Sequence, residues 1–462
     1  AKYADGRNKT SGGDFWFSVL TSVASARPTT GGRTAGSVVD HNNGTYSVFF
    51  YCGWEGTAHI HIALAAPSKA TKWLRGNFWP IEKRVFWTAT FVGGAVKRGK
   101  PVTEATLCYL LRNVTSSQYC VVDYNPKATG LTALYCEKPK KALTCDSLRT
   151  LKLDVNAISS RTKELIGADA NLFEGDNWMQ MLLQGPQNVS IAPKSPNTTH
   201  VKSRTPDCQP YANRVVNDGF WLDQKWNYLQ CQVRRWDEPT AVKECLRHKY
   251  VYILADSTVR SWYGEITRKL GLPWKHLGKG KYTHVMDSYL AQTDLNMTFR
   301  FYPRVVTKAP LSLITTLYEV DLLDGIPSEN CSRYILVFAP WAHLAQWTQE
   351  SFIEHALLLR KAILRFRVRC PDVPIVVKGT FPREHVDTTM SVVCHDYTLW
   401  VLGRTLRQIF RGTGVYYYDV WQMSMAYGPS HIHMPAAVIS EEVNWLLSYV
   451  CRENTHILPD DA

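Results

Sequence analysis

Apolar runs alternate with amphipathic stretches through the second half of the chain, from about residue 206 onward. The run from Tyr250 to Leu254 has the length and composition of a buried strand. Gly271 marks the C-terminal end of the helix predicted to follow. The apolar residues of that helix recur with 4-3-4 spacing, at Val259, Tyr263, Ile266 and Leu270.

Further strand and helix patterns follow toward the C-terminus. Strands are predicted over 334–338, 374–378 and 415–418, and helices over 352–366, 397–410 and 443–450. Strand–helix alternation is typical of a parallel sheet covered by helices on both faces. We therefore predict an α/β domain with a parallel sheet over residues 206–462.

The first 150 residues show the shorter, alternating period of β-structure. Residues 36–50 predict a hairpin with Asn43-Gly44 in its turn, and residues 58–64 predict an alternating strand. Short strands at this spacing indicate an all-β, Ig-like sandwich. His59 and His61 would lie on one face of the second segment, but two histidines are a poor ligand set and no metal site is predicted.

The intervening stretch is polar and contains several prolines, most densely over 184–199. Such a composition predicts an exposed connector. The expected organisation is therefore a β-sandwich domain over 1–150, a glycosylated connector over 151–205 and the α/β domain over 206–462.

Cysteines and glycosylation sequons point to the secretory pathway. The 462 residues include 12 cysteines without any Cys-x-x-Cys pair, which favours disulfides over a zinc site. Their pairing is open, although Cys231–Cys245 and Cys370–Cys394 are close in sequence. Seven Asn-x-Ser/Thr sequons begin at Asn8, Asn43, Asn113, Asn188, Asn197, Asn296 and Asn330.

Membrane and leader segments are not expected. No apolar run reaches the roughly 18–20 residues that span a bilayer. The first residues do not resemble a signal peptide, so the numbering is expected to begin on a mature or trimmed chain. The expected location is the extracellular space or the Golgi lumen.

The formal net charge of +13 predicts attraction to anions. Nucleic acid is a poor partner for a glycosylated lumenal protein, whereas sialylated or sulfated glycans fit better. Two basic clusters are candidates for such a surface, although each also fits a solvated helix face. They are Lys269, Lys275, Lys279 and Lys281, and Arg360, Lys361, Arg365, Arg367 and Arg369.

Ser257 lies in the predicted turn between the strand that ends at Leu254 and the following helix. Open α/β sheets bind ligands at this edge, and backbone N–H groups at a helix N-terminus favour a developing oxyanion. The alternative is that Asp256 or Ser257 only caps the helix.

A nucleophilic serine needs a base, and the candidates before the last helix are His431 and His433. In an extended stretch they point to opposite faces, so at most one faces Ser257. Serine early and histidine late on an α/β sheet matches SGNH/GDSL-type hydrolases, and the chain has no G-x-S-x-G motif. A metal held by the two histidines is disfavoured, because no carboxylate cluster lies near them.

Several segments together resemble the NXPE family (neurexophilin and PC-esterase domain proteins). Residues 244–262 are similar to its ECL-x-x-K…GDST-x-R-x-W signature, and residues 419–428 followed by His433 are similar to its C-terminal block. The 36–50 hairpin, Trp54-Glu55-Gly56 and Ala66-Pro67-Ser68 resemble the neurexophilin-like β domain.

The resemblance implies a neurexophilin-like β domain followed by an SGNH-like PC-esterase domain, related to enzymes that add or remove O-acetyl groups on glycans. It implies Ser257 as nucleophile and oxyanion donor through its N–H, His433 as general base, and Asp256 as support for the turn. His343 and Arg260 would face the pocket.

Three positions depart from the family pattern. Ala255 replaces the glycine before Asp-Ser, Ser430 falls where the acid of Asp-x-x-His is expected, and Ala342 replaces a polar residue before His343. Asp419, at a strand end, is a candidate substitute for the acid, or a turn cap. Loss of a triad acid costs about 10⁴-fold in rate in the Ser-His-Asp template.

Two functions follow from these residues. The first is an O-acetyltransferase or esterase in which Ser257 takes an acetyl group from acetyl-CoA or a glycan ester. Its basic surface would hold an anionic glycan or sialoglycoprotein, with sialic acid as a candidate acceptor. The second is a secreted binding protein on a decayed esterase scaffold, whose β domain engages a protein partner.

Overall fold

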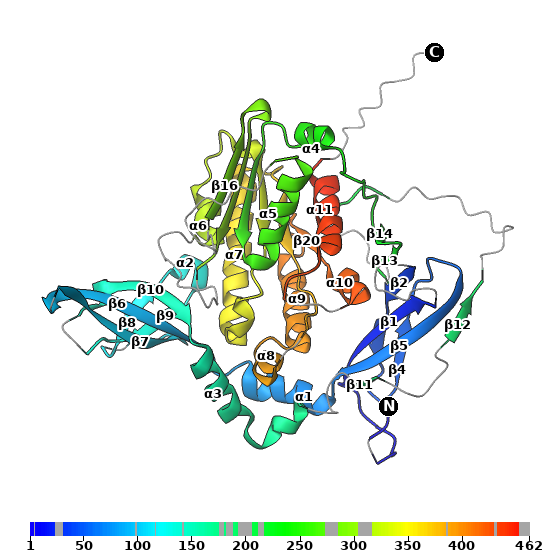
Figure 1. Cartoon of the computed structure of the whole chain (residues 1–462), viewed down its shortest axis with the longest axis horizontal. Helices are drawn as coiled ribbons and strands as arrows, with labels where there is room; N and C mark the ends of the chain where they lie inside the picture. The colour runs from blue at the N-terminus through cyan, green and yellow to red at the C-terminus, as the bar shows by residue number, and fades with distance from the viewer. Residues whose placement is uncertain are drawn as a thin grey trace.

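The computed structural model describes residues 1–3, 5–23, 31–97, 99–115, 117–140, 143–174, 180–181, 188–192, 206–210, 217–272, 285–303, 317–384, 387–428 and 432–451. Within these residues the strands form sheets of seven, six, five and two strands. Figure 1 shows a central α/β part with an antiparallel sheet on either side of it.

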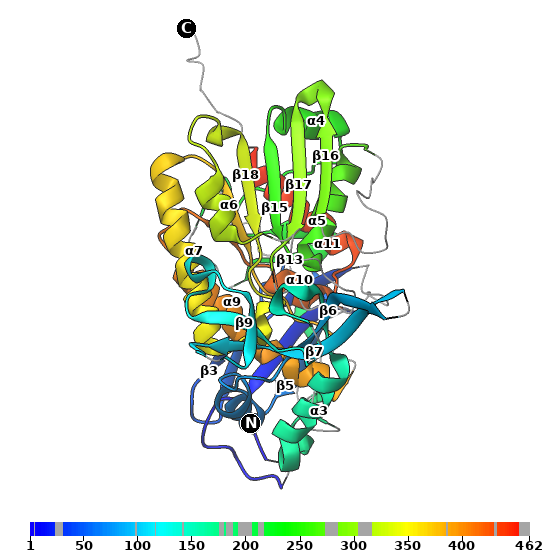
Figure 2. The same ribbon diagram turned by 90° about the vertical axis from the view of Figure 1, so that its left-hand side faces the viewer.

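The six-stranded sheet forms the centre of the α/β part, in the order β16-β17-β15-β18-β19-β20. Its strands are β15 (Tyr250–Ala255), β16 (Val285–Leu290), β17 (Leu295–Phe301), β18 (Tyr334–Phe338), β19 (Ile375–Lys378) and β20 (Tyr416–Tyr418). All neighbouring pairs are parallel except the edge pair β16–β17. Figure 2 shows β16, β17, β15 and β18 side by side. The four predicted strands are confirmed, and the sheet is mixed because of the unpredicted β16.

Helices cover both faces of this sheet (Figure 1). α5 and α11 lie on one face, and α6, α7 and α9 lie on the other. Their bounds are α5 (Ser257–Lys269), α6 (Glu319–Gly325), α7 (Gln349–Arg369), α9 (Asp396–Phe410) and α11 (Ala436–Val450). Shorter helices are α4 (Pro239–Cys245), α8 (Thr388–Val393) and α10 (Trp421–Tyr427). The α/β layering predicted from strand–helix alternation is therefore confirmed.

The seven-stranded sheet has the order β11-β5-β1-β2-β13-β14, with β12 also paired to β5. Its strands are β1 (Phe15–Ser22), β2 (Gly32–Ala35), β5 (Gly56–Ala66), β11 (Gln180–Met181), β12 (Asn188–Ile191), β13 (Gly219–Leu222) and β14 (Lys225–Tyr228). Antiparallel pairing of β2 with β13 brings together residues on both sides of position 206. The predicted hairpin is confirmed as β3 (Ser37–Asp40) and β4 (Tyr46–Phe49), with Gly44 at φ +84° in its turn.

The five-stranded sheet has the order β10-β6-β7-β9-β8. Its strands are β6 (Phe86–Lys97), β7 (Lys100–Arg112), β8 (Tyr119–Asp123), β9 (Thr132–Glu137) and β10 (Leu148–Leu153). Helices α2 (Pro126–Thr129) and α3 (Val155–Ile166) connect it to α7 and α8, whereas α1 (Ser68–Trp73) follows β5.

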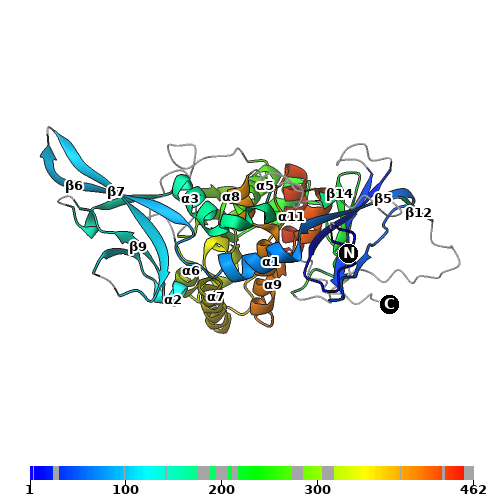
Figure 3. The ribbon, with the colours of Figure 1, turned by 90° about the horizontal axis from the view of Figure 1, so that it is seen from below.

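The two large antiparallel sheets lie at opposite ends of the molecule (Figures 1 and 3), so they do not face each other as the sheets of the expected Ig-like sandwich would. The physical reason is a different burial partner for each sheet. Strands β1, β2 and β13 pack against α10, whereas β6 and β9 pack against α3 and α2. Short alternating strands only require an apolar surface to cover one face, and the pattern does not say which surface supplies it.

Ten cysteines form disulfides, and both pairings suggested by sequence proximity are wrong. The bridges are Cys108–Cys136, Cys120–Cys145, Cys208–Cys231, Cys245–Cys451 and Cys331–Cys370. Cys245 at the end of α4 meets Cys451 directly after α11, so folding and not chain spacing decides its partner. Cys52 is free and exposed, and Cys394 is free and buried.

Candidate functional site

Ser257 is the first residue of α5, directly after β15 and Asp256. Asp256 is fully buried and its Oδ1 accepts a hydrogen bond of 2.7 Å from the backbone N–H of Thr258. Asp256 therefore caps α5, which leaves the hydroxyl of Ser257 to other contacts. Ala255 lies outside the positive-φ region, so the departure from glycine at this position causes no backbone strain.

Ser257 and His433 are brought together although 176 positions separate them. Oγ of Ser257 lies 2.9 Å from Nε2 of His433, which is hydrogen-bond distance. His433 is exposed and lies three residues before α11, and Ser257 is half-buried. A neutral imidazole at this distance can accept the hydroxyl proton as the oxygen attacks a carbonyl.

Tyr302 supports the turn that carries Ser257. Its hydroxyl donates a hydrogen bond of 3.1 Å to Oδ2 of Asp256 and accepts one of 3.4 Å from the backbone N–H of His343. Burial, together with the Asp256 carboxylate, raises the pKa of Tyr302 well above its usual value, so the phenol stays a neutral donor. Tyr302 is not among the site residues predicted from the sequence, although its place directly after the alternating segment of β17 was a signal for it.

His343 follows β18 and lies beside the dyad. Its ring centroid is 6.3 Å from that of Tyr302. Burial lowers the pKa of His343; the Asp256 carboxylate opposes this shift, whereas the His433 and Arg383 charges reinforce it. His343 is therefore neutral at pH 7. Ser257, Tyr302 and His343 all follow the carboxyl ends of parallel strands, which is where open α/β sheets bind ligands.

Arg260 and Asp419 have different surroundings from each other. Arg260 is three residues after Ser257 on α5, hence on the same face of that helix, with its guanidinium 5.8 Å from the ring centre of Phe301. Asp419 forms an ion pair of 3.2 Å with Arg407 and accepts a 3.3 Å hydrogen bond from the backbone N–H of Trp421, the first residue of α10. The cap predicted as an alternative for Asp419 is therefore present. Ser430 and His431 lie outside the described residues.

The sequon asparagines and the residues of the predicted basic clusters lie in different environments. Asn296 is half-buried in β17, and Asn197 is outside the described residues. The remaining sequon asparagines are exposed, namely Asn8, Asn43, Asn113, Asn188 and Asn330. Lys269 is buried and contacts the Trp236 carbonyl oxygen, so it is not part of a basic surface. Lys275, Lys279 and Lys281 are not among the described residues.

The second basic cluster, on α7, is largely committed to structural contacts. Arg365 pairs with Asp324. Three other arginines donate to backbone carbonyl oxygens of neighbouring segments: Arg360 to Ile409, Arg367 to Gly414 and Arg369 to Leu323.

His59 and His61 lie on β5, where Nε2 of His61 is 3.0 Å from Oγ1 of Thr21. Across the described residues, no group of three or more His, Cys, Asp or Glu side chains is arranged to hold a metal ion.

Among the described helices, none has both the length and the apolar character needed to cross a bilayer.

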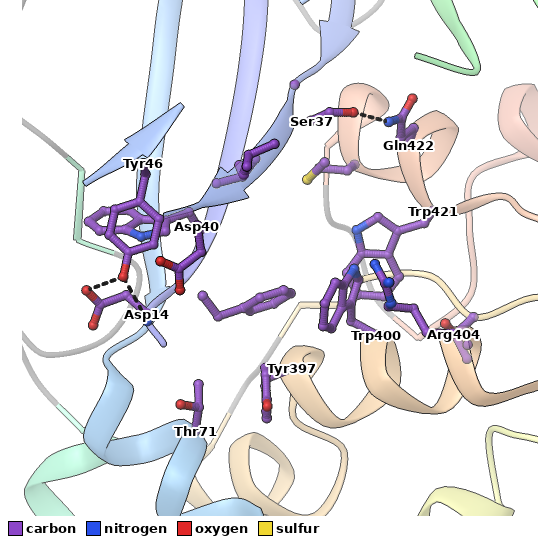
Figure 4. A pocket seen from close by; sticks show the side chains of 18 of the residues that line it. Asp14, Ser37, Asp40, Tyr46, Thr71, Tyr397, Trp400, Arg404, Trp421 and Gln422 are labelled. Carbon is purple, nitrogen blue, oxygen red and sulfur yellow. Dashed lines mark hydrogen bonds between the residues drawn. The ribbon is translucent and has the colours of Figure 1, made fainter. Parts of the chain in front are cut away.

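A cavity of about 760 Å³ lies between the α/β part and the seven-stranded sheet with its neighbouring β3–β4 hairpin. Figure 4 shows Asp14, Asp40 and Tyr46 on one side of it and Trp400, Arg404 and Trp421 on the other. Asp419 also lines this cavity.

Two family models match the chain. Residues 5–160 match the model described as Neurexophilin. Residues 226–451, which contain the Ser257/His433 pair, match the model described as NXPE family member 4-like, C-terminal domain.

Proposed function

Because the chain belongs to the NXPE family, we propose that it is a secretory-pathway glycoprotein whose PC-esterase-like, SGNH-type domain transfers or hydrolyses O-acetyl groups on glycans. The observation that carries this proposal is the 2.9 Å distance between Oγ of Ser257 and Nε2 of His433. Five disulfides support a secreted or Golgi-lumenal location.

In the proposed reaction, Oγ of Ser257 attacks the carbonyl carbon of an acetyl thioester such as acetyl-CoA, or of a glycan acetyl ester. His433 takes the hydroxyl proton at Nε2 and then gives it to the departing thiol or alcohol, which leaves an acetyl ester on Ser257. A sugar hydroxyl or water then attacks that ester and passes its proton to His433. The bond between the acetyl carbon and Oγ of Ser257 breaks, and His433 returns the proton to Oγ. The backbone N–H of Ser257 is the proposed oxyanion donor, a contribution of about 3 kcal/mol for one such group.

The surrounding residues support this assignment. Asp256 and Tyr302 fix the turn that presents Ser257, and a neutral His343 adds no competing positive charge next to His433. Arg260 is the proposed contact for an anionic substituent of the acceptor, since it lies one helical turn from Ser257. An anionic glycan such as a sialoside is the proposed acceptor because the chain carries a formal net charge of +13.

One observation favours a second function. Asp419, the candidate triad acid, is bound to Arg407 and to the backbone N–H of Trp421 in α10, and loss of the triad acid costs about 10⁴-fold in rate in the Ser-His-Asp template. On this alternative the chain is a secreted binding protein of the same family that uses its neurexophilin domain to hold a protein partner.

Hydrolysis of p-nitrophenyl acetate and release of CoA from acetyl-CoA, with a sialoside acceptor present, test the enzymatic proposal. Ser257→Ala should abolish both. Ser261→Ala is the matched control, because Ser261 lies on α5 and donates only to the local Thr258 carbonyl among its described contacts. Equal rates for Ser257→Ala and the unaltered chain would favour the binding protein.

A further inference from the structure

The cavity between the seven-stranded sheet side and the α/β part has two walls of different origin (Figure 4). One wall comes from β3, β4 and the start of β1, and it includes Asp40, Tyr46 and Asp14, the residue before β1. The other comes from α9 and α10 and includes Trp400 and Trp421. Because the walls come from the two family-matched regions, the cavity exists only when these regions pack together.

Aromatic faces and guanidinium groups meet on the α9 wall. The rings of Tyr397 and Trp400 are stacked, with centroids 6.3 Å apart. The guanidinium of Arg404 lies 4.8 Å from the ring centre of Trp400, and that of Arg75 lies 5.2 Å from the ring centre of Tyr397. Both arginines are exposed. Flat apolar rings beside fixed hydrogen-bond donors suit a ligand with C–H faces and many polar substituents.

Carboxylates on the opposite wall are held in place by their own hydrogen bonds. Oδ1 of Asp14 accepts from the backbone N–H of Ser68 at 2.8 Å, and its Oδ2 accepts from the hydroxyl of Tyr46 at 3.1 Å. Oδ2 of Asp40 accepts from the backbone N–H of Gly13 at 2.7 Å. Oδ1 of Asp14 also forms an ion pair of 2.6 Å with Lys9, and the Asp14 side chain is buried, so Asp14 shapes the wall and does not reach a ligand. Asp40 is half-buried, and its carboxylate oxygens each have a second lone pair for a hydroxyl donor.

The two walls are also tied to each other. The side-chain amide of Gln422 on α10 donates to Oγ of Ser37 at 3.0 Å, across 385 positions of sequence. The cavity is therefore organised before any ligand enters, which lowers the entropic cost of binding.

The charge of the lining decides between two classes of ligand. The lining contains four basic side chains, Lys72, Arg75, Arg404 and Arg407, and four acidic ones, Asp14, Asp40, Asp218 and Asp419. Two of the acidic groups are in ion pairs, Asp14 with Lys9 and Asp419 with Arg407. A polyphosphate such as the nucleotide part of CoA would bring several negative charges close to these carboxylates, which is unfavourable. A ligand rich in hydroxyl groups, with no more than one negative charge, finds both hydrogen-bond donors and acceptors on the lining.

The cavity lies at the catalytic edge of the sheet. Thr380 and Asp419, which follow the carboxyl ends of β19 and β20, line it, and Ser257 follows the same end of β15. β20 is three places from β15 in the sheet, or about 14 Å at ~4.8 Å per strand. An oligosaccharide spans such a separation, whereas a single sugar does not.

We propose that this cavity is a saccharide-binding subsite that holds part of the acceptor glycan while another part reaches Ser257. Trp400 and Trp421 provide the stacking surfaces, Arg404 takes the carboxylate of a monoanionic sugar, and Asp40 accepts a hydrogen bond from one of its hydroxyl groups. The inference rests on the proposed function for the identity of the ligand as an acceptor, although binding in the cavity does not require catalysis.

Saturation-transfer NMR on the full chain carrying Ser257→Ala tests this subsite, with 3′-sialyllactose as the monoanionic probe. Trp400→Ala and Arg404→Gln should each reduce the saccharide signals at least about fivefold. Val368→Ala is the control, since that side chain is 86% exposed on α7 and does not line the cavity. Arg404→Gln keeps the test decisive if Trp400→Ala does not fold, because Arg404 is exposed and its replacement leaves the core unchanged.

Unchanged saccharide signals in both cavity variants would overturn the inference. Displacement of 3′-sialyllactose by equimolar CoA, with the CoA signals lost in Trp400→Ala, would also overturn it, because the cavity would then hold the donor. Binding is measured in the Ser257→Ala background and acetyl transfer in the unaltered chain, which separates the two proposals. Acetyl transfer without cavity binding removes only this inference, and cavity binding without acetyl transfer removes only the enzymatic proposal.

Discussion

The hydroxyl of Tyr302 lies 3.1 Å from Oδ2 of Asp256, and both side chains are buried beneath the turn that carries Ser257. The other carboxylate oxygen of Asp256, Oδ1, accepts a hydrogen bond from the backbone N–H of Thr258 at the N-terminus of α5. One buried carboxylate therefore fixes the helix start and, through Tyr302, the segment that carries His343.

Tyr302→Phe should lower the free energy of unfolding by about 1.5–3 kcal/mol, the usual contribution of a hydrogen bond to a charged group. Urea denaturation measures this loss. Tyr250→Phe is the control, because the Tyr250 hydroxyl has only a 3.5 Å contact with Thr298. Equal stability of Tyr302→Phe and the unaltered chain would show that Asp256 does not depend on Tyr302.

Glu319 predicts a pH dependence of stability. Its side chain is fully buried at the start of α6, and within the described part of the chain neither carboxylate oxygen has a hydrogen-bond partner. Burial raises the pKa of Glu319 from 4.5 to about 7, with Asp321 adding to the shift. Nε2 of His355 lies 3.8 Å from Oε2 of Glu319.

Since the folded state binds the Glu319 proton more tightly than the unfolded state does, the contribution of Glu319 to stability is greatest below pH 4.5 and falls as pH rises through 7. The expected loss from this group is about 3 kcal/mol by pH 8. Glu319→Gln should therefore raise the free energy of unfolding at pH 8 and change it little at pH 5. Glu329→Gln, at an exposed position, should do neither. A lower stability of Glu319→Gln at pH 8 would mean that the charged carboxylate is stabilised in the folded chain.

Lys378 and Glu442 form an ion pair of 2.7 Å in which both side chains are completely buried. The indole N–H of Trp262 also donates to Oε2 of Glu442. Lys378→Met should cost about 3–5 kcal/mol, because it leaves a buried carboxylate without its cation. The double variant Lys378→Met/Glu442→Gln should recover most of that loss in the same denaturation experiment, since the amide still accepts from Trp262. Equal destabilisation by the single and double variants would argue against an electrostatic cause.

The disulfide pattern predicts the order in which thiols react. Iodoacetamide should modify Cys52 in the native chain and Cys394 only after denaturation, because Cys52 is exposed and Cys394 is buried. Peptide mapping without reduction should recover Cys245 linked to Cys451. A peptide linking Cys231 to Cys245 would contradict the fold around α4 and α11.

The features that the sequence predicted well are those set by local pattern. The run Tyr250 to Leu254 became β15, the 4-3-4 spacing became α5, and Gly271 adopts φ +68° after its end. The pairing of Ser257 with a late histidine was also predictable, because both residues flank elements of one α/β sheet. The choice of His433 came from the family resemblance.

Tertiary packing decided the rest. The two large antiparallel sheets pack against different helices and not against each other. The alternation of apolar and polar residues within a strand does not specify which surface covers it. Cys245 forms a disulfide with Cys451 because the C-terminal ends of α4 and α11 lie next to each other. The ion pair that binds Asp419 depends on Arg407 of α9, twelve residues earlier, and the cavity depends on two regions that no local motif connects.

The most direct test of acetyl transfer through Ser257 is the mass of the intact chain after incubation with acetyl-CoA, followed by peptide mapping. We expect one added acetyl group, located on Ser257, which is absent in Ser257→Ala, strongly reduced in His433→Gln and unchanged in Ser261→Ala. An acetyl group that persists in Ser257→Ala, or no acetylation of the unaltered chain by acetyl-CoA or an activated acetyl ester, would contradict it.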